Sequence, residues 1–324
     1  MKNKKILITG ASGYIGSCLS YYLLKKYEVF LLDKKKPNNF TKIKKNFFQC
    51  NLLHKKKIYK ILNDIKPDVI IHLAGQSTVN ERILMNNYYQ NNFIATRNLL
   101  DTMKKIKIKN IIFSSTAAVY KKTNKALFEN SFKKPLSKYG KTKLMSENLL
   151  LRERKVFSII LRFFNVTSAL NKPLIGEVNK PVTHLIPRSI SKCFQGKTMT
   201  IFGKNFPTKD GTCLRDYIHI RDICNAVDKS ILYVIKYKNN NVFNLGSGKA
   251  MSNLDIARYI QTKYRKKNII KFTNKRKGDT PKLFCSIRKA KKILNWKPNH
   301  SDIIRIVNDE IDWNNYLAKK NIHR

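Results

Sequence analysis

Two residues whose side chains could together move a proton, Tyr139 and Lys143, lie four positions apart in the sequence. On a helix this spacing places both side chains on one face, so that the ammonium stands beside the phenol. A free phenol has a pKa of about 10, and a fixed neighbouring cation favours the phenolate and lowers that pKa. The pair therefore predicts a proton shuttle, although the same spacing is also common on lysine-rich helices without any chemistry.

Three glycines, Gly10, Gly13 and Gly16, follow a short apolar segment at residues 5–9 and precede an amphipathic pattern at residues 18–26. This order predicts a strand, a turn and a helix. Such glycines allow a tight turn, close approach of the backbone to a pyrophosphate and close packing of the helix on the strand. The spacing is GxxGxxG rather than GxGxxG, and the triplet alone also fits an ordinary turn.

An acidic residue, Asp33, ends the next apolar segment, at the distance from the glycines expected for a ribose-binding acid. Its carboxylate accepts hydrogen bonds from a ribose diol and repels a 2′-phosphate. The first part of the chain therefore predicts a dinucleotide site that prefers NAD to NADP.

Apolar segments continue at residues 47–49, 69–73, 110–114 and 157–161, with helical patterns between them. This alternation predicts an α/β fold with a parallel sheet that is wrapped on both faces. Ligands bind at the carboxyl ends of such strands. Those ends carry Gly10, Asp33, Asn51, Ala74 with Gly75, residues 114–116 and residues 163–165.

The composition excludes several classes of protein. The 324-residue chain has a formal net charge of +46, but its lysines are spread along the whole length without interleaved aromatic residues, which favours solvated faces over a specific nucleic-acid surface. No apolar run reaches the roughly 18 residues that cross a bilayer. The six cysteines and six histidines show no metal-ligand spacing. We expect a cytoplasmic protein that binds no membrane and no metal.

The motifs at residues 9–16, 72–75, 113–120 and 139–143 resemble those of the extended short-chain dehydrogenase/reductases, and most of all the UDP-sugar 4-epimerases in that family. The resemblance runs almost end to end and implies a Rossmann-type sheet with bound NAD. Asn51 stands where the family usually has an aspartate, and its amide oxygen still accepts a hydrogen bond from adenine. The cofactor-binding residues implied are Gly10, Gly13, Tyr14, Ile15, Gly16, Asp33, Asn51, Leu52, Ala74, Gly75, Asn92, Tyr139 and Lys143.

Residues 203–220 form a polar loop that runs into a strand and contains Arg215. The planar guanidinium donates two parallel hydrogen bonds to phosphate oxygens, whereas an ion pair with the neighbouring Asp216 is the alternative. Arg276 is a second candidate for a diphosphate. The resemblance implies a UDP-sugar held by Thr116, Tyr139, Asn165, His184, Arg215, Arg276 and Asp279; His184 stands where other members often have Asn.

The resemblance also implies a catalytic set of Tyr139, Lys143 and Thr116 and a 4-keto sugar intermediate. Dehydration is disfavoured, because Ala117 and Ala118 replace the acid pair that dehydratases use. Epimerisation of an N-acetylated or pentose UDP-sugar stays open. Leu283 lies near the position where bulky side chains in the family restrict an acetamido group, and one aliphatic residue of intermediate size does not decide which sugar fits. A non-catalytic NAD-binding sensor is the alternative from another class.

The family architecture implies two domains and a homodimer. Residues 1–168 would form the NAD-binding domain, to which residues 216–248 return. Residues 169–215 and 249–324 would form a smaller α/β domain that binds the UDP-sugar. The glycines at 246 and 248 are expected to form a plain strand-to-helix turn rather than a second phosphate loop.

Overall fold

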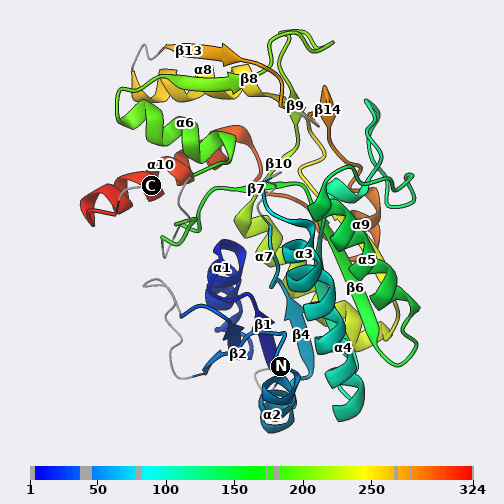
Figure 1. The fold of residues 1–324 in the computed structure, drawn as a ribbon. Coiled ribbons are helices and arrows are strands. Elements are labelled where there is room, and N and C mark those ends of the chain that lie inside the picture. Colours follow the sequence, from blue (N-terminus) through cyan, green and yellow to red (C-terminus); the bar gives the residue numbers. More distant parts are fainter. Residues whose placement is uncertain are drawn as a thin grey trace.

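The larger part of the chain folds around a seven-stranded parallel sheet with strand order β11-β6-β5-β4-β1-β2-β3 (Figure 1). The computed structural model describes residues 4–36, 46–77, 82–171, 174–178, 182–265, 269–276 and 279–322. In this part of the chain the sheet consists of β1 (Lys5–Thr9), β2 (Glu28–Asp33), β3 (Phe47–Gln49), β4 (Val69–His72), β5 (Asn110–Thr116), β6 (Phe157–Phe163) and β11 (Asn241–Leu245).

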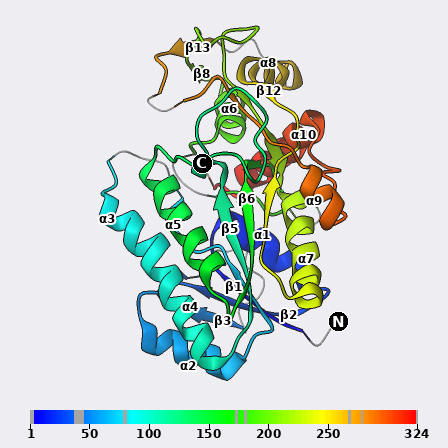
Figure 2. The same cartoon turned by 90° about the vertical axis from the view of Figure 1, so that its right-hand side faces the viewer.

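Helices cover both faces of this sheet, because successive strand residues point to opposite sides. On β1, Ile6 and Ile8 belong to one buried apolar cluster and Leu7 to another. Figure 2 shows α4 and α5 on one side of the sheet and α7 on the other. The first cluster includes α1 (Tyr14–Leu23) and α7 (Ile220–Tyr237), and the second includes α2 (Lys55–Ile65), α4 (Ala95–Ile106) and α5 (Lys138–Arg152). The predicted doubly wound α/β class is confirmed.

The strand order reverses between β1 and β4. Ligands of open parallel sheets bind outside the carboxyl ends of the strands at such a switch point. Gly10 follows β1, Asp33 ends β2, Ala74 lies two residues beyond β4, and Thr116 ends β5. The fold therefore brings residues that are distant in the sequence to one edge of the sheet.

A smaller lobe lies beyond that edge (Figure 1). It has an apolar core of its own, in which Ile190, Ile201, Ile256 and Ile306 are buried. Its strands form the two-stranded sheet β8–β13 and the three-stranded sheet β12–β9–β14, while β7 and β10 pair in parallel at its junction with the main sheet. The elements are α6 (Leu185–Phe194), α8 (Asn253–Tyr264), α10 (Ile303–Lys319), β7 (Asn165–Thr167), β8 (Met199–Phe202), β9 (Leu214–Arg215), β10 (Tyr217–His219), β12 (Met251–Ser252), β13 (Ile270–Thr273) and β14 (Lys282–Leu283).

The chain passes between the two parts more than once. After β9 in the smaller lobe it forms α7 on the main sheet, and β11 then pairs with β6 as the edge strand. This order supports the proposed return of residues 216–248, although the exact division into domains stays a proposal. The remaining short helices are α3 (Met85–Tyr88), the π-helix η1 (Tyr89–Ile94), the 3-10 helix η2 (Ala117–Val119) and α9 (Arg288–Ile293).

Some boundaries differ from those that the sequence indicates. Helix α1 begins at Tyr14 rather than near residue 18, because Gly13 is its N-cap residue. Strands β5 and β6 each run two residues further than expected, since their ladder stays in register to the pair Thr116 and Phe163. None of the helices in the described residues is long and apolar enough to span a membrane. The same residues contain no cluster of three or more potential metal ligands.

Candidate active site

The glycine turn after β1 leaves no space for side chains. Gly10 has φ +73°, and a Cβ there would lie 2.6 Å from the Ala74 nitrogen. A Cβ on Gly16 would lie 2.2 Å from the Gly10 oxygen, so α1 packs directly on the turn. Gly13 caps α1 without a side-chain hydrogen bond, which leaves the N–H groups of its first turn, at Tyr14 and Ile15, without a side-chain cap. This turn fits the pyrophosphate of a dinucleotide.

The second cofactor element lies at the ends of β2 and β3. Asp33 accepts hydrogen bonds from the Ser12 N–H at 3.0 Å and the Lys35 N–H at 2.9 Å, one on each carboxylate oxygen. Each oxygen keeps lone pairs for ribose hydroxyls. Asn51 Oδ1 accepts from the Leu53 N–H, at 3.1 Å. Leu52 is 4% exposed, so its side chain belongs to the core and only its backbone is suited to a cofactor contact.

A buried chain of hydrogen bonds positions the segment after β4. His72 contacts Thr9 Oγ1 through Nδ1 at 2.7 Å and Thr96 Oγ1 through Nε2 at 2.9 Å. Burial lowers the pKa of His72 to about 3, so the ring is neutral and serves as one donor and one acceptor. The Ala74 N–H donates to Thr9 Oγ1 at 3.4 Å. These bonds hold Ala74 and Gly75 against the glycine turn.

Asn92, in the π-helix η1, is a positioning residue in this structure. It is 1% exposed, and its Oδ1 accepts from the Gln76 N–H at 2.7 Å. Its Nδ2 donates to Thr142 Oγ1 at 2.9 Å, beside Lys143 on α5. These bonds tie the Gly75 segment to the helix of Lys143. The cofactor contact expected of Asn92 stays a prediction.

The catalytic candidates meet where α5 begins. Ser137 caps this helix by accepting from the Gly140 N–H at 3.0 Å. A Cβ on Gly140 would lie 2.4 Å from the Ala118 carbonyl oxygen, so the helix start packs directly on the turn after Thr116. Tyr139 and Lys143 follow each other by one turn of α5, and Tyr139 is hydrogen bonded to Thr116. The three side chains are therefore brought together.

The pKa of the phenol differs in direction from the expectation. Burial raises the pKa of Tyr139 to about 12, and the hydrogen bond with Thr116 only partly opposes this. Burial also lowers the pKa of Lys143 to about 7, against the charge of Glu147. The Lys143 ammonium lies 4.1 Å from the centre of the Phe113 ring. Desolvation is the largest cause of both shifts, since it disfavours both charged forms, and neither shift has the other residue among its causes.

The substrate candidates Arg215, Asp279 and Arg276 form one cluster. Arg215 Nη2 lies 3.3 Å from one Asp279 oxygen, and Arg276 Nε lies 3.2 Å from the other. Arg215 Nη1 also donates to the Thr280 carbonyl at 2.7 Å. The alternative pairing of Arg215 with Asp216 is wrong, because Asp216 is fully buried and accepts from the N–H groups of Ser247 and Gly248. The Asp216 carboxylate fills the turn at residues 246–248 and takes the hydrogen bonds of its N–H groups. This turn is therefore a plain strand-to-helix turn rather than a second phosphate loop.

The other substrate candidates surround this cluster. Asn165 donates through Nδ2 to the Asp216 carbonyl at 3.0 Å, and it lies two residues beyond Phe163, the strand partner of Thr116. His184 caps α6, with its side chain half exposed and Nδ1 3.4 Å from Glu177 Oε2. A hydrogen bond with Glu177 raises the pKa of His184.

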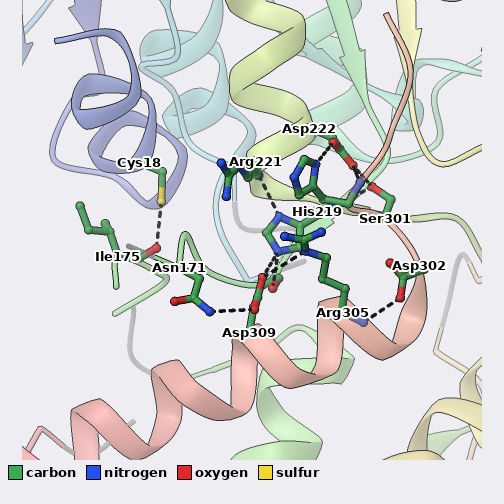
Figure 3. Close-up of polar contacts among 12 residues, drawn as sticks. Cys18, Asn171, Ile175, His219, Arg221, Asp222, Ser301, Asp302, Arg305 and Asp309 are labelled. Atoms are coloured by element: carbon green, nitrogen blue, oxygen red, sulfur yellow. Dashed lines mark hydrogen bonds and ion pairs between the residues drawn. The ribbon is translucent and has the colours of Figure 1, made fainter. Parts of the chain in front are cut away.

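A polar cluster surrounds His219 and includes Asp309 of α10 (Figure 3). His219 Nε2 lies 3.1 Å from Asp309 of α10 and 3.0 Å from Ser168 Oγ, and its Nδ1 accepts from the Arg221 N–H. The Tyr14 hydroxyl in turn donates to the Ser168 carbonyl at 2.5 Å. The hydroxyl of Tyr14 is therefore occupied by its hydrogen bond to Ser168. The ring and the backbone of Tyr14 remain available for the predicted cofactor contact.

Several side chains at the site were not identified from the sequence. Arg188 and Arg276 place their guanidinium carbons 5.0 and 4.7 Å from the centre of the Phe202 ring. Glu147 extends the face of Tyr139 and Lys143 by one more turn, so the same spacing rule could have found it. No local pattern marks Arg188 or Phe202, because their contact arises only when α6 packs on β8.

Known proteins are similar to this chain over nearly their full length. Residues 6–246 match the profile of the NAD dependent epimerase/dehydratase family. A UDP-glucose 4-epimerase of Lactobacillus helveticus is 33% identical over 321 residues, which is 95% of this chain and 96% of the relative.

Two solved structures extend the comparison. The UDP-glucose 4-epimerase of Bifidobacterium longum in complex with NAD⁺ and UDP is 26% identical, with a TM-score of 0.88 over 97% of this chain and 98% of that one. The UDP-Glc/GlcNAc 4-epimerase of Campylobacter jejuni is 29% identical, with a TM-score of 0.82 over 97% and 100%. The chain belongs to the NAD-dependent epimerase/dehydratase family and, within it, to the NAD-dependent UDP-sugar 4-epimerases.

Proposed function

We propose that the protein interconverts UDP-glucose and UDP-galactose by inverting C4 of the sugar through a 4-keto intermediate. The single observation that carries the proposal is the meeting of Tyr139, Thr116 and Lys143 at the carboxyl edge of the sheet. The name of the Lactobacillus helveticus relative supports glucose and galactose as the sugars.

Tyr139 takes the proton of the 4-hydroxyl and returns it after the inversion. Bound NAD supplies a hydride acceptor and donor at C4 and a positive ring that favours the phenolate. Thr116 orients the same sugar oxygen by a hydrogen bond, and Lys143 holds the cofactor ribose. Tyr139 would therefore act as a base only with the cofactor bound, because burial alone raises its pKa to about 12.

Arg215 and Arg276 hold the diphosphate, and this anchor lets the sugar turn its other face toward the cofactor between the two transfers. Asp279 bridges the two guanidinium groups. Leu283 pairs in register with Arg215 and packs in the apolar cluster of Ala117, beside Thr116. This position supports a role for Leu283 in limiting the size of the sugar.

The test incubates purified protein, without added cofactor, with UDP-glucose, UDP-N-acetylglucosamine or UDP-xylose and identifies the products by NMR. Conversion of UDP-glucose to UDP-galactose is expected. Exclusive conversion of UDP-N-acetylglucosamine or UDP-xylose would assign a different sugar, and no conversion with NAD bound would indicate a sensor. Tyr139→Phe should bind NAD and lose about 10²-fold or more of the activity. The matched variant Tyr89→Phe, on η1, should keep its activity.

A homodimer stays a proposal from the family. Sedimentation of the protein at several concentrations tests it, and a monomer at every concentration would exclude it.

A further inference from the structure

The backbone of Ser168, directly after β7, is strained. Its φ is +76°, in the left-handed region that residues with a Cβ disfavour, and the residue is 1% exposed. Of the other non-glycine residues with positive φ in the described part of the chain, two are asparagines and four cap helices, where this conformation is common. Strained residues persist only where surrounding contacts hold them, and they cluster at functional sites. The contacts that hold Ser168 therefore bear on function.

Ser168 joins the start of α1 to His219. The Ser168 carbonyl accepts a hydrogen bond from the Tyr14 hydroxyl at 2.5 Å, and Ser168 Oγ lies 3.0 Å from His219 Nε2. Tyr14 is the first residue of α1, whose first turn belongs to the predicted pyrophosphate site. The segment after Ser168 contacts the same helix, since the Cys18 thiol donates to the Ile175 carbonyl at 3.4 Å (Figure 3). The position of Ser168 is therefore linked to that of the glycine turn.

The hydrogen bonds of His219 fix the place of its ring proton. The backbone N–H of Arg221 can only donate, so His219 Nδ1, 2.9 Å away, carries no proton. The proton is therefore on Nε2, which lies 3.1 Å from Asp309 Oδ2 and 3.0 Å from Ser168 Oγ. The His219 backbone N–H donates to Ser301 Oγ at 2.9 Å, and the whole residue is buried. His219 is thus a fixed hydrogen-bond donor that faces both Asp309 and Ser168.

These three residues do not form a hydrolytic triad. In such a triad the serine and the acid bind opposite nitrogens of the imidazole, so that the serine proton can pass to the ring. Here Ser168 and Asp309 both face Nε2 of His219, which already carries the proton, and Nδ1 accepts from the Arg221 N–H. The cluster can hold a backbone conformation, but it cannot activate the serine hydroxyl.

Asp309 brings the smaller lobe into this cluster. It lies on α10, where Ile306 and Val307 are buried in the apolar core of that lobe. Its other carboxylate oxygen lies 3.3 Å from Asn171 Nδ2, and Arg305 Nε is 3.9 Å from Oδ2. A continuous series of contacts therefore runs from the lobe that carries the substrate candidates to the first residue of α1.

We propose that His219, anchored by Asp309, is a positioning residue for the cofactor site. It holds Ser168 in its strained conformation, and the Ser168 carbonyl in turn holds Tyr14 at the start of α1. The inference rests on the proposed function only in placing NAD at the glycine turn, and it does not depend on the sugar. A purely structural role would lower stability alone, whereas this role also weakens NAD binding in protein that stays folded.

The main test compares His219→Asn with His219→Gln. The Asn oxygen can replace Nδ1 as the cap of α7, but this side chain is too short to reach Asp309 and Ser168. The Gln amide nitrogen can replace Nε2 as the donor to both. Calorimetry measures NAD binding, without sugar, to protein freed of cofactor. His219→Asn should lose about five- to tenfold in affinity, and His219→Gln should stay within about twofold of the native protein. Equal affinities of the two variants would overturn the inference.

Asp309→Ala covers failure of His219→Asn to fold, because the Asp309 side chain is only partly buried. This variant removes the anchor of His219 and should also lower NAD affinity by about five- to tenfold. Asp312→Ala, at an exposed carboxylate on the same helix, is the matched control and should bind NAD as the native protein does. Native affinity in a folded Asp309→Ala protein would contradict the proposed role of the cluster.

A double variant separates positioning from general destabilisation. Tyr14→Phe removes the hydroxyl that Ser168 binds and should weaken NAD binding by a factor similar to that of His219→Asn. If both substitutions act through Ser168, the double variant should bind NAD no more weakly than the weaker single variant. Losses that multiply in the double variant would show that His219 does not act through Tyr14.

Kinetics at saturating NAD separate the inference from the proposed function. His219→Asn should then convert UDP-glucose with nearly native kcat and KM, because Tyr139 and Arg215 keep their own contacts. A loss of kcat with native NAD affinity would count against the inference. If the native protein binds NAD but converts no UDP-sugar, the proposed function alone fails, since the NAD affinities of the variants still decide the role of His219.

Discussion

The cofactor side and the substrate side of the site are built differently. On the cofactor side the backbone forms the binding surface, and Gly10 and Gly16 leave no space for a Cβ. On the substrate side charged side chains from distant segments form a cluster, in which Arg215 is 11% and Arg276 56% exposed. A backbone site tolerates little change, whereas a side-chain cluster near the surface can lose a member and keep its fold.

The largest effect is expected from Gly16→Ala. Its Cβ would lie 2.2 Å from the Gly10 oxygen and 2.7 Å from the Ala11 Cα, so α1 must move away from β1. We expect loss of bound NAD and of all activity, with the free energy of unfolding lowered by about 1–3 kcal/mol. The absorbance of the purified protein measures the bound NAD, and denaturation curves measure the free energy of unfolding.

Gly13→Ala is the matched control in the same turn. Its φ of −76° suits alanine, and the added Cβ would lie 3.3 Å from the Gly10 oxygen. This variant should keep its fold and retain more NAD than Gly16→Ala. Equal damage in both variants would contradict the view that helix packing, rather than glycine as such, matters at residue 16.

Lys143→Met tests whether burial of the Lys143 ammonium lowers the free energy of unfolding while the same side chain supports activity. Activity should fall by about 10²-fold or more. Burial lowers the pKa of Lys143 from 10.5 to about 7, so between these values the unfolded chain holds a proton that the folded chain has lost. The stability of the native protein therefore rises with pH across this window relative to the variant.

Urea denaturation of both cofactor-free proteins at pH 6 and pH 9 measures the difference. The variant should gain most over the native protein at pH 6, and its gain should shrink at pH 9. A difference that does not depend on pH would show that the Lys143 pKa is not lowered by burial.

Arg215→Met should have a smaller effect, confined to the substrate side. The diphosphate loses its buried guanidinium, and the Thr280 carbonyl loses a hydrogen bond. KM for UDP-glucose should rise by about 10- to 100-fold while NAD stays bound. Steady-state kinetics with a parallel NAD assay measure this, and loss of NAD would mean that the two sides are not separable.

Arg276→Met should have the smallest effect. The side chain is 56% exposed and its ion pair with Asp279 spans only three residues, so the fold should be as stable as before. KM should rise by up to about tenfold. Lys275→Met, at the neighbouring exposed cation, should leave KM unchanged. Equal effects of the two substitutions would indicate a general electrostatic field rather than a specific contact.

Much of the cofactor side could be predicted from the sequence, because its signals are local. The three glycines lie within seven residues, and Tyr139 and Lys143 lie within one helical turn. The role of Asp33 as the ribose-binding acid is predicted from its distance to the glycines, which is the length of one strand–helix–strand unit. The start of α1 was placed four residues late, since a glycine N-cap gives no side-chain signal for the helix start.

The contacts between distant segments could not be predicted in the same way. Arg215 pairs with Asp279, 64 residues away, rather than with its neighbour Asp216. The bond from the Asn92 amide to Thr142 joins η1 to α5 across 50 residues, and no local pattern in the sequence marks it. Residue types show what a side chain can bond to, and only the tertiary structure decides which partner reaches it.

The sequence by itself determined the order of strands and helices in the first half, the glycine turn and the pairing of Tyr139 with Lys143, because spacing along the chain sets which residues share a turn or a strand end. The choice of Thr116 came from the resemblance to the family. Only the tertiary structure decided the charge states and the pairings. Burial raises the pKa of Tyr139 and lowers that of Lys143, and it places Glu147 on Arg162. The physical reason is desolvation, since the free energy of a charge depends on how much water the folded chain removes from around it.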